Sequence, residues 1–279
     1  MSEEVSENKK FASKRKVNMP RVLTAIIIVV AILLSIYHGA FGLSILFAII
    51  VIFGGYELSK ILDRPKTNIG SYIHIVLASA PMLFFRSGYA TENVYTIGIF
   101  ISCALMVYLI INLWMNPIAY EKFKYFFTFL YWGLPFGLAT YLLFHTNNDI
   151  QMMFFGIIIL LWTSDTMAYL TGKAIGKNKL FPSVSPGKTR EGSLGAGFFS
   201  VLVGIGFAYA INDNIPKWIV IAIIVWIIGT LGDLVESRIK RVQNVKDSGS
   251  ILPGHGGFLD RFDSLVMVIP FLLVFDYFF

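Results

Sequence analysis

Long apolar runs recur along the whole chain, and they restrict its fold more than any other feature. A helix needs about 20 mainly apolar residues to cross a bilayer. Runs of roughly that length lie at residues 22–37, 40–60, 71–85, 94–113, 125–144, 150–171, 194–211, 217–232 and 264–279. Of the 279 residues, 56% are hydrophobic and 14% are charged, which is too apolar for a soluble domain. We therefore predict an all-α fold, a polytopic transmembrane helical bundle of about nine spans.

The positions of the basic residues predict how these spans are oriented. Lysine and arginine concentrate in cytoplasmic loops. Here 21 of the 23 fall in the N-terminal tail or in loops on the tail's side of a nine-span bundle, and only Arg86 and Lys217 do not. We therefore expect a cytoplasmic N-terminus and a C-terminus outside. Residues 1–21 are expected to form a disordered basic cytoplasmic tail, and residues 22–148 the N-terminal transmembrane helices.

Composition also excludes several classes of protein. The formal net charge of +6 could suggest a nucleic-acid binder, but the basic residues lie at span ends and no RNA- or DNA-binding motif occurs. The single cysteine, Cys103, lies in an apolar run, so a disulfide framework or a CxxC metal site is excluded. We expect no nucleic-acid partner.

One polar stretch near the C-terminus, residues 232–264, reads GDLVESRIKRVQNVKDSGSILPGHGGFLDRFDS. It contains five of the chain's 17 acidic residues, interleaved with five basic ones. These are Asp233, Glu236, Asp247, Asp260 and Asp263, with Arg238, Lys240, Arg241, Lys246 and Arg261. Carboxylates bind hard divalent cations, whereas lysine and arginine bind phosphate oxygens. The stretch is therefore predicted to hold a divalent cation together with a polyphosphate.

The two halves of this stretch are predicted to differ in structure. Asp233, Ser237 and Lys240 recur at steps of three or four residues, so they share one face of a helix. The second half contains Pro253 and several glycines, which break a helix. The Gly-His-Gly-Gly run at residues 254–257 lets backbone N–H groups approach an anion, so this half is predicted to be a loop.

Twelve positions of the stretch form a recognisable pattern. They are Ser237, Lys240, Arg241, Lys246, Asp247, Pro253, His255, Gly256, Gly257, Asp260, Arg261 and Asp263. This pattern resembles the C-terminal signature of the phosphatidate cytidylyltransferases, the CDP-diacylglycerol synthases of phospholipid biosynthesis. Residues 162–192, WTSDTMAYLTGKAIGKNKLFPSVSPGKTREG, are similar to the family's second block. The two blocks lie in roughly the C-terminal 40% of the chain.

The resemblance implies an integral membrane nucleotidyltransferase that forms CDP-diacylglycerol and pyrophosphate from CTP and phosphatidate. It implies that residues 149–279 are the C-terminal catalytic transmembrane region. It also implies the cell membrane as location, an active site facing the cytoplasm, contact with membrane lipid, and a homodimer. The expected cofactor is Mg²⁺, with room for a second cation.

Asp233 and Asp260 are the main candidates for binding the metal, because each lies next to a predicted span at the cytoplasmic interface. The alternative is an interfacial salt bridge with a neighbouring arginine. The resemblance, in which acids at these two positions bind the catalytic cation, favours the metal. Asp247 and Asp263 are weaker candidates for the same role.

The basic residues and one histidine are expected to bind the anionic substrates. As the resemblance implies, the residues that stabilise the substrates and the transition state are Lys188, Lys240, Arg241, Lys246 and Arg261, with Ser237 orienting a phosphate. A phosphomonoester has a second pKa near 6 and is already ionised at neutral pH, so no general base is needed. We therefore assign His255 to phosphate binding or to loop structure.

The run from Ser185 to Thr189, SPGKT, is superficially like a P-loop. The first glycine of that motif would fall on Pro182 and no strand is expected before it, so a P-loop is excluded. A turn with a lysine and hydroxyls can still bind phosphates, and the resemblance places this segment in the site. Ser185, Lys188 and Thr189 are therefore candidates for binding CTP, the alternative being a charged surface loop.

Asp165 lies inside the predicted sixth span, roughly 10 Å of helix before the span ends near Gly172. A carboxylate at that depth is costly unless it faces a wet cavity or a partner. We predict that Asp165 and Asp233 border one cytoplasm-facing polar cavity where lipid phosphate meets CTP. The alternative is a structural hydrogen bond to a neighbouring helix.

Other functions compete with this interpretation. The nearest is a CTP-dependent lipid kinase acting on a polyprenol. A CDP-alcohol phosphotransferase is disfavoured, because the chain has no DG-x-x-AR motif. An intramembrane acid such as Asp165 would also suit a membrane transporter. A transporter favours paired halves with broken helices, however, whereas the polar residues here crowd one end of the chain.

Overall fold

The computed structural model describes residues 22–63, 68–115, 123–145, 150–253 and 256–278, and these are almost entirely helical. The helices are Val22–Tyr37, α2 (Gly39–Leu62), α3 (Asn68–Arg86), α4 (Glu92–Ile111), α5 (Lys124–Phe127), α6 (Leu134–His145), α7 (Ile150–Ile175), α8 (Arg190–Ile211), α9 (Ile215–Val242) and α10 (Asp263–Phe278). A π-helical turn, η2 (Thr128–Gly133), joins α5 to α6, and a short 3-10 turn, η3 (Leu259–Arg261), precedes α10.

These helices coincide in order with the predicted apolar ranges when α5, η2 and α6 are taken as one unit, so the all-α fold is confirmed. Seven units are long and apolar enough to cross a membrane: α2, the part of α3 from Ile69 to Arg86, α4, Lys124–His145, α7, α8 and α9. Helix Val22–Tyr37 is apolar but shorter, and α10 has 16 residues. The architecture is that of an integral membrane protein. The tail predicted at residues 1–21 lies outside the described residues.

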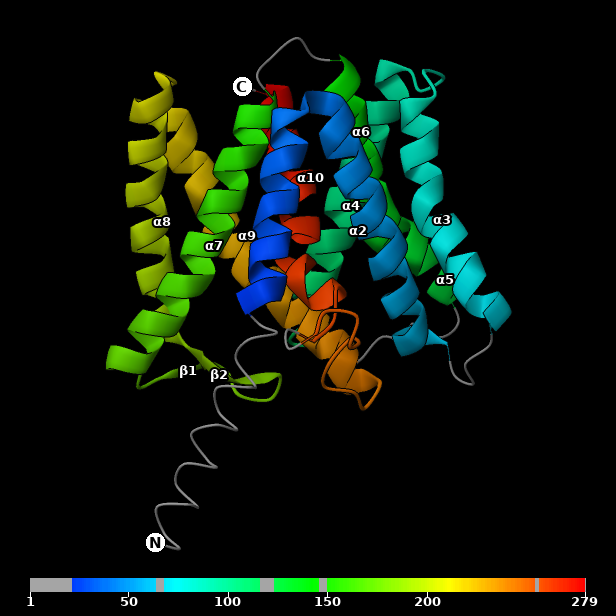
Figure 1. Cartoon of the computed structure of the whole chain (residues 1–279). Coiled ribbons are helices and arrows are strands. Elements are labelled where there is room, and N and C mark those ends of the chain that lie inside the picture. Colours follow the sequence, from blue (N-terminus) through cyan, green and yellow to red (C-terminus); the bar gives the residue numbers. More distant parts are fainter. Residues whose placement is uncertain (1–21, 64–67, 116–122, 146–149, 254–255, 279) are drawn as a thin grey trace, which may run out of the picture.

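Helix α10 lies in the middle of the bundle, with α9, α4 and α6 packed around it (Figure 1). Every residue from Asp263 to Pro270 is buried. A helix that is apolar all round is expected inside a protein rather than at its surface. Because protein surrounds α10, its length of about 24 Å does not have to match the thickness of a bilayer.

One end of the bundle carries the polar segments. An antiparallel hairpin, β1 (Lys179–Phe181) and β2 (Ser185–Thr189), connects α7 to α8 and pairs Lys179 with Thr189. The segment between α9 and α10 lies at the same end (Figure 1). The two blocks singled out in the sequence therefore meet, although the 39 residues from 193 to 231, nearly all of them helical, separate them.

Helices α7 and α8 approach each other closely where the hairpin ends. A Cβ on Gly192 would lie 2.6 Å from the carbonyl oxygen of Ala168 and 3.1 Å from the Cα of Gly172, so a larger residue would push the helices apart. Thr189 caps α8, its Oγ1 accepting a hydrogen bond from the N–H of Gly192 at 3.1 Å. The cap joins the end of β2 to α8, and the packing of Gly192 holds that point, and with it Lys188, against α7.

Candidate active site

A cavity of about 770 Å³ lies at the polar end, between α7, the hairpin, α8, α9 and the start of α10. Its charged lining consists of Asp165, Asp233, Glu236, Asp247, Asp260 and Asp263 together with Lys173, Lys188, Lys240 and Arg261. Six acidic and four basic side chains leave a formal excess of two negative charges. A divalent cation would balance that excess.

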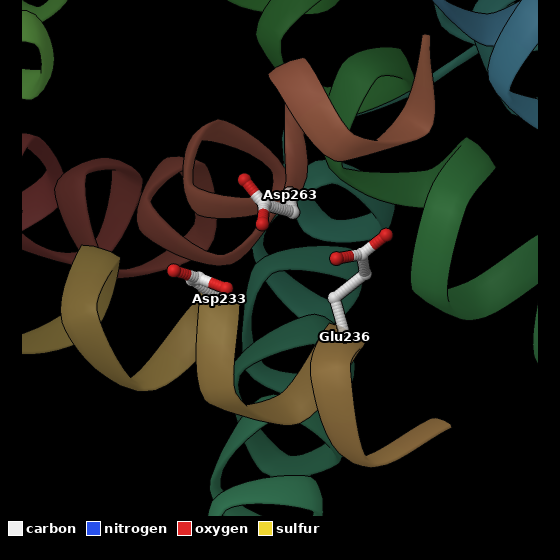
Figure 2. A group of neighbouring side chains, drawn as sticks. All are labelled: Asp233, Glu236 and Asp263. Atoms are coloured by element: carbon white, nitrogen blue, oxygen red, sulfur yellow. The ribbon is translucent and has the colours of Figure 1, made fainter. Parts of the chain in front are cut away.

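Three of the acids converge from two helices, as Figure 2 shows. Asp233 and Glu236 lie one turn apart on α9, and Asp263 is the first residue of α10. One carboxylate oxygen from each lies within 4.8 Å of the other two. We refer to Asp233, Glu236 and Asp263 as the acidic group.

Asp233 is held by residues that the sequence also assigned to the site. Lys188 Nζ lies 2.6 Å from its Oδ2, and Ser237 Oγ donates to its Oδ1 at 3.2 Å. The same lysine donates to the carbonyl oxygen of Thr230 at 3.3 Å. Lys188 thus joins the hairpin to α9 and brings one positive charge to the acidic group.

Glu236 and Asp263 are buried carboxylates with few partners. Lys240 Nζ lies 2.7 Å from Glu236 Oε2, whereas Glu236 Oε1 has no hydrogen-bond partner among the described residues. Asp263 Oδ1 accepts a hydrogen bond from the N–H of Ser264 at 2.6 Å. Buried carboxylates this close repel each other unless a cation lies between them. The oxygen ligands of the acidic group therefore fit a hard cation such as Mg²⁺.

Asp260 lies beside this group, with its oxygens bonded to the protein. Lys240 Nζ donates to Oδ1 at 2.6 Å, and the N–H groups of Ser248 and Gly257 donate to Oδ2 at 3.3 and 3.1 Å. Burial alone would raise the pKa of Asp260, but the hydrogen bonds from Lys240 and the Gly257 amide and the charge of Lys240 outweigh it and lower the pKa to about 2. Asp260 is therefore a carboxylate at neutral pH, and it anchors Lys240.

The other predicted site residues divide into those that line the cavity and those that do not. The lining includes Asp165, Ser185, Lys188, Thr189, Lys240, Asp247, Asp260 and Arg261. The prediction that Asp165 and Asp233 border one polar cavity is confirmed.

Three predicted residues that the structure describes are not among the lining: Ser237, which bonds Asp233, and Arg241 and Lys246. Arg241 is exposed outside the cavity and donates from Nη1 to the carbonyl oxygen of Val245 at 3.3 Å. Lys246 is also exposed outside the lining. His255 lies outside the described residues. The chain turns at Asn244, two residues after α9 ends at Val242, where the backbone is left-handed with φ of 54°. Arg241 and Lys246 lie on either side of this turn.

Sequence reasoning missed Glu236 as a member of the site. Its spacing of three residues from Asp233 would have placed both acids on one face of α9. The helical spacing described in the sequence is that of Asp233, Ser237 and Lys240, and Glu236 counts there only as one of the five acids of the stretch. Lys173, which also lines the cavity, carried no comparable signal beyond its place in the second block.

Comparison with known proteins gives consistent matches. A protein from Staphylococcus aureus (strain COL) named phosphatidate cytidylyltransferase is 44% identical over 138 residues, covering 49% of this chain and 53% of the relative. One of the same name from Staphylococcus haemolyticus is also 44% identical over 138 residues. The chain thus spans about half the length of these staphylococcal relatives. A third of that name, from Bacillus subtilis (strain 168), is 30% identical over 259 residues, covering 90% of this chain and 95% of the relative.

The match to a family description is broader. The description "Cytidylyltransferase family" matches residues 19–279, which include every described helix and the whole of the cavity lining. The Bacillus match likewise extends over nearly the entire length of both proteins. The chain therefore belongs to the cytidylyltransferase family.

Proposed function

We propose that this protein transfers the cytidylyl group of CTP to phosphatidate, forming CDP-diacylglycerol and pyrophosphate. The relatives named phosphatidate cytidylyltransferase support this activity. The observation that carries it is the cavity itself, where the acidic group and Lys188 meet at one end of an apolar helical bundle. A nucleotide and a lipid headgroup can meet only where a polar cavity adjoins an apolar surface.

The reaction joins two anions. A phosphate oxygen of phosphatidate attacks the α-phosphorus of CTP, and the bond from that phosphorus to the oxygen bridging to the β-phosphate breaks in line. The electron pair leaves with pyrophosphate. The attacking phosphomonoester is already ionised near neutral pH, so the site has to reduce repulsion rather than remove a proton.

The acidic group would hold the cation. Asp233, Glu236 and Asp263 supply oxygen ligands, and the formal excess of negative charge in the lining favours one divalent ion. When bound, Mg²⁺ supplies charge neutralisation at the phosphates of CTP and at the leaving pyrophosphate. Lys240, between Glu236 and Asp260, keeps these two carboxylates from repelling each other.

The remaining cations of the lining are suited to bind phosphates. Lys188 and Lys173 reach the cavity from the hairpin and from α7, and Arg261 reaches it from the turn before α10. Arginine and lysine stabilise the developing negative charge of a phosphoryl transition state. Ser185 and Thr189 lie beside Lys188 and offer hydroxyls to the same phosphates.

The proposal includes an orientation. With nine spans and a cytoplasmic N-terminus, the cavity would face the cytoplasm, where CTP is made available, and the C-terminus would lie outside the cell membrane. The distribution of lysine and arginine supports this arrangement. A cysteine placed at Ser250, an exposed residue between Asp247 and Asp260, should then react with a membrane-impermeant reagent only in inside-out vesicles, in a background where Cys103 is replaced by alanine. A cysteine at Ser87 should show the opposite pattern.

The homodimer implied by the resemblance stays a prediction, which cross-linking in the membrane would test.

An experiment with two labelled nucleotides tests the activity. Purified protein is incubated with phosphatidate, Mg²⁺ and CTP labelled in either the α- or the γ-phosphate. Cytidylyl transfer moves the α label into lipid and releases the γ label as pyrophosphate. A CTP-dependent lipid kinase, given a polyprenol, would move the γ label instead. A transporter would move neither label, and that result would disprove the proposal.

A further inference from the structure

Glu57 connects the N-terminal helices to the site. It lies on α2, whereas the cavity lining, as far as the described residues show, falls between residues 164 and 264. Its side chain is fully buried. Its Oε2 accepts hydrogen bonds from Ser248 Oγ at 2.9 Å and from the N–H of Leu259 at 2.8 Å. One carboxylate of α2 therefore binds both ends of the loop that precedes α10.

Two glycines of this loop make room for the carboxylate. A Cβ on Gly249 would lie 2.2 Å from Glu57 Oε1, and a Cβ on Gly257 would lie 2.7 Å from Oε2 and 1.6 Å from Ser248 Oγ. Real side chains do not approach so closely, so neither position admits a larger residue without moving Glu57. The sequence analysis expects the Gly-His-Gly-Gly run, which includes Gly257, to approach an anion. In the structure Gly257 and also Gly249, which lies outside that run, make close contact with Glu57 of α2.

The polar contacts of Glu57 continue to Asp260. Ser248 donates its hydroxyl to Glu57 and its backbone N–H to Asp260 Oδ2. Leu259 directly precedes Asp260 in the chain. Asp260 in turn bonds Lys240, whose Nζ lies 2.7 Å from Glu236 in the acidic group. A continuous series of polar contacts thus runs from α2 to the proposed cation ligands.

A ring contact and a further hydrogen bond also join the N-terminal helices to this loop. The rings of Phe53, one turn before Glu57 on α2, and Phe258 lie with centroids 5.5 Å apart. Thr24 Oγ1, on the first helix, donates to the carbonyl oxygen of Pro253 at 2.9 Å. The loop is therefore attached to the N-terminal helices at several points, and Glu57 is the attachment that reaches Asp260 through shared residues.

We propose that Glu57 is a positioning residue of the enzyme, which holds Ser248 and Leu259 so that Asp260 and Lys240 set the geometry of the acidic group. This inference rests on the proposed function, because it concerns the same site. The proposed role depends on the two hydrogen bonds that Oε2 of residue 57 accepts from Ser248 and Leu259. Glutamine can accept both through its side-chain carbonyl, whereas leucine, of similar size, can accept neither and leaves two buried donors unpaired.

The test compares Glu57→Leu and Glu57→Gln with Asp63→Leu. Asp63 is a matched control, because it is also a buried acid at the end of α2 but pairs with Lys124 instead of the loop. Three measurements are made on each purified protein. They are the Mg²⁺ concentration for half-maximal turnover, the rise in melting temperature that Mg²⁺ produces, and hydrogen exchange in residues 243–262 relative to α7 and α8.

Glu57→Leu should raise the half-saturating Mg²⁺ concentration about 10-fold or more, in line with the loss of other residues that support metal ligands. It should weaken the Mg²⁺-dependent rise in melting temperature and speed exchange in residues 243–262 selectively. Glu57→Gln should restore most of each property. Asp63→Leu should lower the melting temperature without changing the Mg²⁺ requirement or the loop's exchange relative to α7.

The proposal is overturned if Glu57→Leu needs no more Mg²⁺ than wild type, or if exchange increases equally in every helix. It is also overturned if Asp63→Leu raises the Mg²⁺ requirement as much. Should Glu57→Leu not fold, Ser248→Ala removes one of the two bonds and should shift each property in the same direction but less. Should wild type make no CDP-diacylglycerol, the proposed function fails, and the melting and exchange measurements still decide the role of Glu57.

Discussion

Two groups of charged side chains in the described part of the bundle, each at least partly buried, differ in what surrounds them. In one, which we call the Asp63 cluster, Asp63 forms an ion pair with Lys124 and its Oδ2 lies 3.9 Å from His74 Nε2. His74 Nδ1 in turn lies 2.6 Å from Thr128 Oγ1. None of these four residues lines the cavity. The other is the acidic group on α9 and α10, which opens directly into it.

The Asp63 cluster and the acidic group differ in their balance of charge. In the Asp63 cluster one carboxylate meets one ammonium group, so their formal charges cancel, although Asp63 Oδ2 has no hydrogen-bond partner among the described residues. In the acidic group, three carboxylates share Lys188 and Lys240, and Lys240 also bonds Asp260. A charge-balanced pair away from the cavity gives no electrostatic reason to bind a cation, whereas an excess of negative charge beside a cavity favours binding one. The comparison therefore predicts that mutations in the acidic group impair activity and that mutations in the Asp63 cluster impair stability.

The largest effect is expected from Asp263→Asn. The substitution keeps the volume of the side chain and removes a charge from the acidic group, so turnover at fixed Mg²⁺ should fall by roughly 100-fold or more. The melting temperature should stay close to that of wild type, because one source of repulsion among buried carboxylates is lost as well. Initial rates with α-labelled CTP and thermal unfolding in detergent measure the two. Near-normal turnover in this variant would remove Asp263 from the proposed metal site.

Glu236→Gln sharpens the comparison, because the structure alone identified this residue. Its Oε1 lacks a hydrogen-bond partner among the described residues. If that oxygen binds the cation, the half-saturating Mg²⁺ concentration should rise roughly 10-fold while turnover at saturating Mg²⁺ falls less. Rates measured over a range of Mg²⁺ concentrations separate the two effects. An unchanged Mg²⁺ requirement would show that Glu236 serves only to bind Lys240.

Asp63→Asn tests the other side of the comparison. It leaves Lys124 without its carboxylate, at a cost of about 1–3 kcal/mol in the free energy of unfolding. The estimate is modest because the Lys124 side chain keeps a quarter of its surface exposed. The melting temperature should fall by several degrees, while the Mg²⁺ requirement of the folded protein stays within about twofold of wild type. A variant of normal stability and low activity would make the Asp63 cluster part of the site.

Much of the fold could be predicted because it rests on local signals. The apolar runs found the helices, since a bilayer-length run of apolar side chains leaves few alternatives. Each helix end lies within four residues of its run except the C-terminal end of α9, which extends from residue 232 to Val242. The cavity could be anticipated from Asp165 and Asp233, because the cost of an intramembrane carboxylate indicates a polar surrounding.

What sequence could not give depends on contacts across the chain. Glu57 lies 191 and 202 residues from its hydrogen-bond partners, and it occupies an apolar helix with no motif around it. Asp260 and Asp263 are both acids at the edge of α10, and only the packing of α9 against α10 shows that Asp263 joins Asp233 while Asp260 turns to Lys240. Local spacing carries no information about which of two nearby acids a distant lysine will bind.

The smallest effect is expected at the opposite end of the bundle, where α8 turns into α9. Asp213 accepts hydrogen bonds there from the N–H of Asn214 at 2.7 Å and from the indole N–H of Trp218 at 2.9 Å. Partial burial would raise the pKa of Asp213, but these bonds and the charge of Lys217 outweigh it and lower the pKa. Because the pKa is lower in the folded state than in the unfolded chain, the carboxylate stabilises the fold at neutral pH. That contribution is lost as the pH falls through the ordinary aspartate range, below about 4.

Asp213→Asn should therefore lower stability at pH 7 by about 0.5–1 kcal/mol, a small figure because a third of the side chain is exposed. The difference from wild type should shrink as the pH approaches about 3, while turnover and the Mg²⁺ requirement at neutral pH stay unchanged. Melting temperatures of both proteins across this pH range, with rates at pH 7, measure these outcomes. A stability difference that persists at low pH would mean that Asp213 acts through its shape instead of its charge. A loss of turnover would mean that the two ends of the bundle are coupled, and the separation between catalytic and structural acids drawn here would be wrong.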